Sequence, residues 1–283
     1  MHQFSLDFNN NCARFPFIFD GKPVTTTGNS PAPSCLISSR EAGDQVFRLP
    51  NKNREALLNM QKIPAGKVYS LFQVHSKNVY TLGSPANNSL SENSLPRPLP
   101  APEDFAREGD GMVSFSAGVF LAVTVADCLP VFLLDTENGF FAILHSGWKG
   151  TGIVLKALNI MQQAGTRPGA VAAVLGPCIQ SCCYKVDEGR AKFFEAEFGP
   201  CPSDYSSGAY PLGPVSRKDE TGWYINLQAA NARLLSAAGV QHIAYCTDCT
   251  FTDTRLGSFR REGTDAYTRM LAVVGTENHN LSH

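Results

Sequence analysis

The chain has 283 residues, of which 24 are basic and 25 acidic, so its formal net charge is −1. This length suits one mixed α/β domain that buries a sizeable core. No basic block is present in the sequence, which excludes the charge pattern of a nucleic-acid-binding protein or of one held on an anionic membrane. A small, neutral or modestly anionic substrate fits this composition better.

The start of the chain and its cysteines favour a cytoplasmic protein with reduced thiols. Residues 1–15 contain no basic stretch followed by an apolar core, which a secretory signal would need. The longest apolar run, 119–134, is shorter than the roughly 18 residues of a membrane-spanning helix and includes Asp127 and Pro130. The nine cysteines are an odd number in a long chain, so we expect free thiols rather than a disulfide framework.

A polar segment interrupts the first half of the chain. Residues 83–109 are rich in Pro, Ser, Asn and Ala, and they cannot bury enough apolar surface to offset the entropy lost on ordering them. They are predicted to form a flexible loop inserted between two parts of one site. We expect the whole chain, 1–283, to fold as a single catalytic domain around this loop.

Apolar periodicity predicts strands and helices after this loop. Runs of β-branched and aromatic residues predict strands at 119–125, 131–135, 140–145, 171–175, 242–247 and 270–274. Helical spacing predicts helices within 147–165, at 187–198 and at 226–238, the last of them ended by Gly239. Short strands joined by long connections indicate an α/β or α+β fold with a mixed sheet.

Two histidines and one cysteine occur where predicted strands give way to loops. Three of the six histidines are close to the chain ends, which leaves His75, His145 and His242. His75 and His145 each end an apolar run, and Cys128 stands two residues before Pro130, which interrupts a strand. Two imidazoles and one thiolate suit zinc and leave a fourth position for water or substrate. The same residues also fit buried core side chains, and their spacing alone does not decide between the two.

Five segments together resemble one known family. They are Gln-Val-His-Ser (73–76), Gly-Asp-Gly-Met-Val-Ser (109–114), Ala-Asp-Cys-Leu-Pro-Val (126–131), His-Ser-Gly-Trp-Lys-Gly (145–150) and Leu-Gly-Pro-Cys-Ile (175–179). In this order, within a match from about Ser39 to Gly275, they look like the YfiH family. Its members are labelled multicopper polyphenol oxidoreductases or laccases, and they are also described as purine nucleoside phosphorylases with adenosine deaminase activity.

The resemblance implies a fold, a working form and a metal site. The implied fold is a layered α/β/β/α arrangement with mixed sheets, shared with some toxin deamidases, and the implied working form is a monomer. The family's zinc ligands fall on His75, Cys128 and His145. The chain departs from the family by having Ser76 for a Gly and Lys149 for an Arg, and the second change loses a bidentate anion fork.

Other residues are candidates for roles beside the metal. Arg40, Arg260 and Arg261 lie in segments that match the family partly or closely. Each is a candidate for holding phosphate, because a guanidinium offers paired donors to an oxyanion, and an ordinary structural arginine is the alternative for each. Asp127 is a candidate catalytic acid, and both Asp127 and Asp110 are candidates for supporting the metal ligands.

The remaining cysteines are predicted to have structural roles. Cys178, Cys182 and Cys183 follow a predicted strand and belong to a turn. Cys246 and Cys249 have the spacing of a redox pair or of half a zinc knuckle, but no second pair of matching spacing follows them.

Three functions are consistent with these residues. The first is a zinc-dependent purine nucleoside phosphorylase for adenosine, inosine, guanosine or methylthioadenosine, with an adenosine deaminase activity. The second is a copper-dependent polyphenol oxidase, although the histidines are too few to build a separate multinuclear copper cluster. The third is a hydrolase or amidase in which His145 activates Cys128, acting on cell-wall precursor peptides to which a family relative is linked. A nucleoside and phosphate, rather than nucleic acid or membrane, are the expected partners, and zinc, with copper as the alternative, is the expected cofactor.

Overall fold

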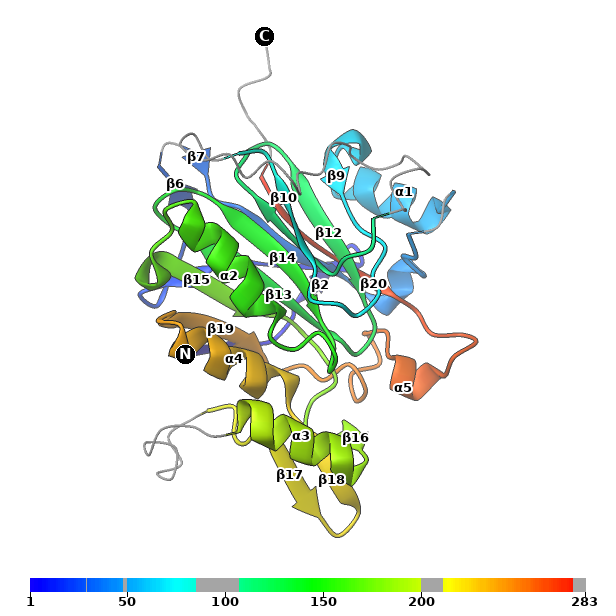
Figure 1. The fold of residues 1–283 in the computed structure, drawn as a ribbon. Coiled ribbons are helices and arrows are strands. Elements are labelled where there is room, and N and C mark those ends of the chain that lie inside the picture. The colour runs from blue at the N-terminus through cyan, green and yellow to red at the C-terminus, as the bar shows by residue number, and fades with distance from the viewer. Residues whose placement is uncertain (29, 48–49, 85–106, 200–210, 277–283) are drawn as a thin grey trace.

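The computed structural model describes residues 1–28, 30–47, 50–84, 107–199 and 211–276 (Figure 1). Two large sheets form the centre of the molecule. The first has seven strands in the order β1 (His2–Phe4), β19 (His242–Cys246), β15 (Val171–Leu175), β13 (Leu129–Asp135), β14 (Phe141–Ser146), β11 (Gly111–Ser114) and β10 (Val79–Leu82). The second has six strands in the order β2 (Phe8–Asn9), β3 (Cys12–Phe15), β8 (Ser34–Ser38), β20 (Met270–Gly275), β12 (Phe120–Val125) and β9 (Val68–Tyr69).

Both sheets are mixed. In the first, β13 pairs antiparallel with β14 and β15, whereas β15 pairs parallel with β19. In the second, β12 pairs antiparallel with β20 and parallel with β9. Three small sheets accompany them, made of β16 (Lys185–Val186), β18 (Gly222–Ile225) and β17 (Ser216–Asp219), of β4 (Ile18–Phe19) and β5 (Lys22–Pro23), and of β6 (Thr26–Thr27) and β7 (Ser30–Pro31). The α-helices of the described residues are α1 (Lys52–Met60), α2 (Ile153–Gln163), α3 (Glu188–Phe198), α4 (Leu227–Ala237) and α5 (Phe259–Glu262).

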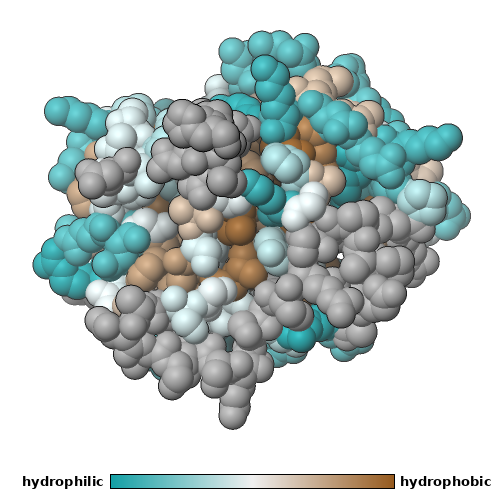
Figure 2. Space-filling view, turned by 90° about the horizontal axis from the view of Figure 1, so that it is seen from above, coloured by the Kyte–Doolittle hydropathy of each residue, from teal (hydrophilic) through white to brown (hydrophobic). Residues whose placement is uncertain are grey.

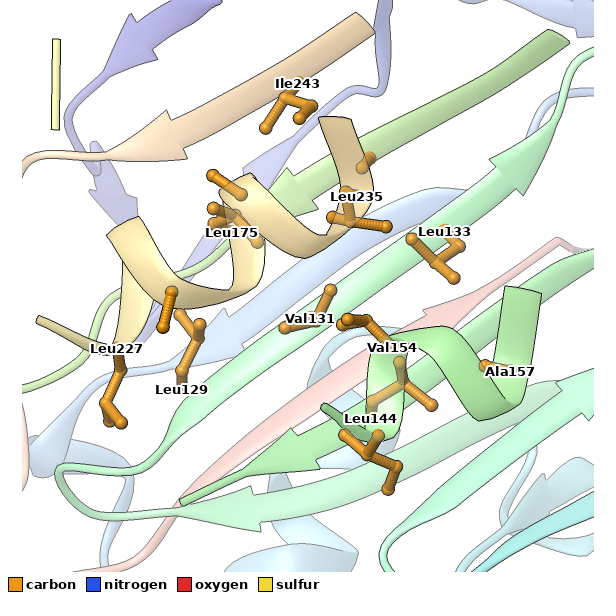
Figure 3. Packing of buried hydrophobic residues seen from close by; sticks show 14 of the residues in the cluster. Leu129, Val131, Leu133, Leu144, Val154, Ala157, Leu175, Leu227, Leu235 and Ile243 are labelled. Atoms are coloured by element: carbon orange, nitrogen blue, oxygen red, sulfur yellow. The ribbon is translucent and has the colours of Figure 1, made fainter. Parts of the chain in front are cut away.

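Strand β13 shows why the sheets stack in layers. Its side chains alternate, so that Val131 and Leu133 pack on the helical side while Phe132 and Leu134 pack against the second sheet. Both faces are therefore buried, which explains the nearly continuous apolar sequence of the strand. On the helical side, strand residues such as Leu129, Leu144 and Leu175 face Val154 of α2 and Leu227 and Leu235 of α4 (Figure 3).

The outer face of the second sheet is covered by α1. Leu57 and Leu58 of this helix are buried with Phe120, Ala122 and Leu271 of the sheet. The order of layers is thus α2 and α4, seven-stranded sheet, six-stranded sheet, α1. The predicted α/β/β/α arrangement with mixed sheets is confirmed.

The predicted elements after residue 110 are present, with shifted ends. Helices α3 and α4 begin after Asp187 and Asn226, whose side chains accept hydrogen bonds from the N–H groups of Arg190 and Ala229. The helix expected within 147–165 begins only at Ile153, because 148–152 form a turn. Strand β13 begins two residues before the predicted Val131. Pro130 can belong to the strand although it has no N–H, because its carbonyl still accepts a hydrogen bond from the Gly176 N–H at 2.9 Å.

Two predictions concern the inserted segment and the number of domains, and two observations concern the surface and the helices. The predicted insertion at 83–109 falls mostly on 85–106, which lie outside the described residues, and the single-domain assignment stays a prediction. On the face seen in Figure 2, hydrophobic residues form a limited area among hydrophilic ones. Among the helices of the described residues, none is both long and apolar enough to cross a membrane.

Candidate metal centre and active site

Strand β14 places His145 at one end of the seven-stranded sheet, next to a buried carboxylate. Gly111 of β11 lies opposite Leu144 of β14, so the preceding Asp110 lies beside His145. The His145 N–H donates to the Asp110 carbonyl at 2.7 Å, and the ring Nδ1 lies 2.8 Å from Asp110 Oδ1. A carboxylate at Nδ1 fixes the tautomer that keeps its hydrogen there, which leaves the lone pair of Nε2 for a ligand.

Cys128 reaches the same place from the neighbouring strand. Leu129 of β13 lies opposite Ser146 of β14, so Cys128, one residue earlier, lies near Gly147. A Cβ atom on Gly147 would come within 2.9 Å of Cys128 Sγ and 3.1 Å of His75 Cδ2. Glycine at this position therefore makes room for the ligand side chains.

His75 is supplied by a loop that is fixed at both ends. Its backbone has a left-handed φ of 61°. The N–H of His75 donates to Asp110 Oδ1 at 3.0 Å, and the N–H and hydroxyl of Ser76 donate to Asp110 Oδ2 at 2.6 and 2.7 Å. Before it, Gln73 exchanges hydrogen bonds of 2.8 and 2.7 Å with the backbone of Thr124 in β12. One carboxylate, that of Asp110, thus orients both histidines of the site.

The three side chains have the arrangement of a metal site. The donor atoms of His75, Cys128 and His145 all lie within 4.8 Å of one another. Zinc bonds of about 2.0–2.3 Å in a tetrahedral site separate such donors by roughly 3.5 Å, so small side-chain movements suffice. Three protein ligands and an outer carboxylate on one histidine are typical of a catalytic zinc site. The donor set therefore fits zinc.

The charges of the site shift the pKa values of the ligands themselves. Burial raises the pKa of the Cys128 thiol, but the charges of His145 and His75 and their hydrogen bonds outweigh it and lower the pKa to about 6. Burial alone disfavours the charged imidazole of His145, yet Cys128 and Asp110 raise its pKa to about 9. Burial likewise raises the pKa of Asp110, and hydrogen bonds from His145 and Ser76 bring it below its usual value. Without a metal, the pair is a thiolate and an imidazolium at neutral pH.

The pH dependence of Cys128 alkylation tests this pairing. In metal-free protein, the rate at which iodoacetamide modifies Cys128 should rise through a midpoint near pH 6 and level off above it, because only the thiolate reacts. The exposed Cys182, whose pKa is raised chiefly by burial, is the internal control and should react appreciably only at alkaline pH. Peptide mass spectrometry follows both cysteines in one sample. A midpoint for Cys128 near the ordinary thiol value of about 8.5 would contradict the assignment.

The ligands open into a cavity of about 410 Å³ that is rich in arginines and aromatic rings. Beside the three ligands, its lining includes Arg190, Arg260, Arg269, Trp148, Tyr184, Phe259 and Tyr267. The Arg190 guanidinium lies 4.2 Å from the centre of the Trp148 ring, and that of Arg269 lies 4.3 Å from the Tyr267 ring. A second cavity of about 410 Å³ shares Gln73, Thr124 and Arg269 with the first. The candidate metal site, several arginine side chains and several aromatic rings thus lie in one region.

A comparison with known families assigns the chain. Residues 36–277 match the model of a family described as multi-copper polyphenol oxidoreductase laccase. The chain belongs to this family. Among solved structures, YfiH of Bacillus licheniformis is similar with a TM-score of 0.68 and 21% identity, covering 87% of this chain and 93% of that one. YlmD of Geobacillus stearothermophilus is similar with a TM-score of 0.70 and 24% identity, covering 96% and 99%. The predicted membership of the YfiH family and its fold are confirmed.

Relatives of this family carry the names of nucleoside enzymes. A purine nucleoside phosphorylase of Corynebacterium glutamicum is 29% identical over 249 residues, which are 86% of this chain and 90% of the relative. An adenosine deaminase of an unknown prokaryotic organism is 34% identical over 166 residues, which are 54% and 59% of the two chains. This chain is therefore similar to enzymes named for two different reactions on purine nucleosides.

Of the predicted residues that are not metal ligands, only some line the cavity. Asp127 and Arg260 both line it, and they are joined because the Arg260 N–H donates to Asp127 Oδ2 at 2.6 Å. Arg261 instead donates to backbone carbonyls, including that of Thr250 at 2.6 Å, and Arg40 pairs with Glu262 at 3.1 Å. Neither Arg40 nor Arg261 is among the residues that line the cavity, so their predicted contact with phosphate lacks support from the geometry.

Several lining residues were not predicted. Arg190 comes from the first turn of α3, and Arg269 directly precedes β20. Tyr184, Phe259 and Tyr267 belong to loops or to the short helix α5. Single arginines and aromatic residues at such places have no local pattern that distinguishes them from surface or packing residues. Only the three-dimensional arrangement brings them together.

Proposed function

We propose that the protein is a zinc-dependent purine nucleoside phosphorylase that also deaminates adenosine. The observation that carries the proposal is the single cavity in which a three-ligand metal site meets three arginines and four aromatic side chains. The names of relatives, which include purine nucleoside phosphorylases and an adenosine deaminase, support both activities. Small molecules, namely a nucleoside and phosphate, are the proposed partners.

His75, Cys128 and His145 would hold the zinc ion. When bound, zinc supplies a Lewis acid and lowers the pKa of a bound water, which suits both phosphorolysis and deamination. Asp110 keeps the His145 ring oriented through Nδ1. Asp127 is the proposed catalytic acid for the departing purine, since this residue lines the same cavity and its Oδ1 accepts from the Thr250 hydroxyl at 2.6 Å.

The arginines are proposed to bind the attacking phosphate. Arg269 is already engaged with the Asp44 carboxylate at 2.6 Å, and Arg260 donates to the Lys185 carbonyl at 2.9 Å. Arg190 pairs more loosely, with the Asp187 carboxylate at 3.6 Å, and its guanidinium lies over the Trp148 ring. Because Arg190 lines the cavity with the longest of these three contacts, we assign it the main contact with phosphate.

The aromatic side chains are proposed to hold the purine. Phe259 and Tyr267 meet edge to face with ring centres 5.0 Å apart, and Trp148 and Tyr184 lie in the same lining. Flat apolar rings stack on a purine without requiring a fixed set of hydrogen bonds. Such stacking would let one site accept adenosine, inosine, guanosine and methylthioadenosine, which are the proposed substrates.

The reaction itself is tested by product analysis. Zinc-loaded protein is incubated with adenosine or inosine, with and without phosphate, and the products are separated by chromatography. We expect free purine base together with ribose 1-phosphate only when phosphate is present, and inosine from adenosine in either case. Base release at the same rate without phosphate, or no change in any nucleoside, would overturn the proposal.

Replacing Arg190 by glutamine tests the phosphate site separately. We expect the KM for phosphate to rise about 10- to 100-fold, because a hydrogen bond to a charged group contributes roughly 1.5–3 kcal/mol. Deamination of adenosine, which uses no phosphate, should change much less. Arg167→Gln is the matched control, since Arg167 is exposed and pairs with Glu137 away from the cavity. Equal losses in both reactions of the Arg190 variant would count against this role.

The thiolate form of Cys128 favours one second candidate, a hydrolase in which Cys128 is the nucleophile. Its pKa of about 6, beside an imidazolium, is the state that such enzymes use. The two functions respond oppositely to a chelator, because a metal ion masks the thiolate. Amide cleavage, including cleavage of cell-wall precursor peptides, that increases when zinc is removed would favour the hydrolase. Phenol oxidation that requires added copper would favour the oxidase named by the family.

We also propose that the protein acts in the cytoplasm as a monomer. Free thiols support the first point, since all eight cysteines of the described residues are unpaired. Size-exclusion chromatography with light scattering tests the second, and a stable dimer would overturn it.

A further inference from the structure

Three cysteines that take no part in the proposed nucleoside site converge at one point. Cys182 and Cys183 follow β15, and Cys249 follows β19. Their sulfur atoms all lie within 4.8 Å of one another, and those of Cys182 and Cys183 are 3.4 Å apart. None of the three lines the cavity beside His145. The cluster is therefore a separate feature of the molecule.

The backbone holds this cluster in place before any ligand binds. Strands β15 and β19 are parallel neighbours, so the chain leaves both at the same end of the sheet. Beyond them, Cys178 and Cys249 form a further β-bridge, and the Thr250 N–H donates to the Cys178 carbonyl at 3.1 Å. The Gln180 N–H donates to Cys249 Sγ at 3.4 Å, and the Gln180 carbonyl accepts from the Cys183 N–H at 2.9 Å. The two segments are thus tied together around the sulfur atoms.

Each sulfur has a different environment. Cys249 is buried and accepts hydrogen bonds from backbone N–H groups. Burial raises the pKa of its thiol, but these hydrogen bonds outweigh burial and bring the pKa below the ordinary value. Burial first, and then the neighbouring sulfurs, raise the pKa of Cys183 to about 12. Cys182 is exposed, which gives a ligand from solvent a route to the cluster. Of the three thiols, Cys249 therefore loses its proton most readily.

We propose that Cys182, Cys183 and Cys249 form a second metal site, which takes one soft monovalent cation, Cu(I), through three sulfur atoms. Thiolates select soft cations such as Cu(I) and zinc. A structural zinc ion normally has four protein ligands, whereas the group found in the described residues contains three and includes no imidazole or carboxylate. Three-coordinate sulfur is sufficient for Cu(I). On binding, each protonated thiol releases its proton to water as its S–Cu bond forms, and copper remains Cu(I).

The cluster borders the cavity through its neighbours in sequence. Thr250 follows Cys249 and donates to Asp127 Oδ1, while Tyr184 follows Cys183 and lines the cavity. A cation bound by all three cysteines would hold the two segments together and so stabilise this side of the cavity. The site does not depend on nucleoside chemistry, so its test is a binding measurement.

The experiment uses the full chain with His75, Cys128 and His145 all changed to alanine, which removes the other site. Cu(I) is added without oxygen in competition with a chromophoric Cu(I) chelator, and X-ray absorption counts the sulfur neighbours. We expect one Cu(I) per chain with three sulfur neighbours. Changing Cys182 or Cys249 to serine should weaken binding by more than about 100-fold, because even outer-shell changes cost 10- to 100-fold in metal affinity.

Cys246→Ser is the matched control. Cys246 is also buried and precedes Cys249 by three residues, but its sulfur contacts Asp248 at 3.6 Å and is not in the cluster. This variant should bind Cu(I) as the parent does. An equal loss in Cys246→Ser and Cys249→Ser would assign the ion to that pair and overturn the proposal. So would undiminished binding by Cys182→Ser, an exposed change that leaves the fold intact. Unmodified protein should hold one more Cu(I) than its Cys182→Ser variant.

Discussion

Changing Cys128 or His145 to alanine is expected to abolish zinc binding and to lower both nucleoside activities by well over about 100-fold. Loss of an outer-shell partner alone typically costs 10- to 100-fold, and these residues are direct ligands in the proposed site. His75→Ala should also lower zinc binding and activity, but by less. The His75 side chain is exposed, so a water molecule can most readily take its place as a ligand. Metal analysis of the purified variants and the two nucleoside assays measure these outcomes.

His242→Ala is the control for these changes. His242 is the remaining histidine away from the chain ends, and its ring packs 3.9 Å from that of Phe19 and lies near Asp20, outside the lining of the cavity. The control should keep zinc and activity. Circular dichroism of the ligand variants should match that of the parent, because removing one side chain from a loop or from the end of a strand leaves the backbone pairing of β13 with β14 in place. Full zinc content in all three ligand variants would show that the site is assigned wrongly.

Much of the second half of the fold is predictable from the sequence, and the physical reason is burial on both faces. Strands such as β13 and β15 have nearly unbroken apolar sequences, and helices α3 and α4 begin after the capping residues Asp187 and Asn226. The strands of the first 40 residues are mostly two to five residues long and contain polar side chains, so periodicity does not reveal them. Helix α1 buries only two apolar side chains, Leu57 and Leu58, and they pack on a sheet whose strands come from both before and after the helix in the sequence.

The candidate site was predictable only in part, and chiefly through the family resemblance. Spacing alone left His75, Cys128 and His145 undecided between a metal site and core packing, because the three come from separate loops and strands. Asp110 could be named as a supporting residue, but its contact with both histidines depends on the register of β11 and β14. Arg190 and Arg269 lie outside every motif. The clustering of Cys182 and Cys183 with Cys249 likewise depends on the parallel pairing of β15 with β19.

Asp110 is expected to control both the stability of the site and its affinity for metal. Its carboxylate is fully buried and accepts hydrogen bonds from the His75 N–H, the Ser76 N–H and hydroxyl, and the His145 ring. Asp110→Asn keeps the shape but puts an NH2 group where only acceptors fit. We expect zinc affinity and activity to fall about 10- to 100-fold, as for other partners of metal-bound histidines. Asp110→Ala should also lose about 3–5 kcal/mol in the free energy of unfolding, because it leaves buried donors and a buried charge without a partner.

A second buried aspartate separates the structural effect from the effect on the metal. Asp135, at the far end of β13, is also fully buried, and its carboxylate accepts from the N–H groups of Glu137 and Asn138 at 2.9 and 3.0 Å. Asp135→Asn should lower the free energy of unfolding by about 1–3 kcal/mol while leaving zinc affinity unchanged, since it reorganises a turn remote from the ligands. Chemical denaturation and competition with a zinc chelator measure the two quantities for both variants. If Asp110→Asn and Asp135→Asn changed them alike, Asp110 would be a structural residue, and the orientation of His145 would have to come from elsewhere.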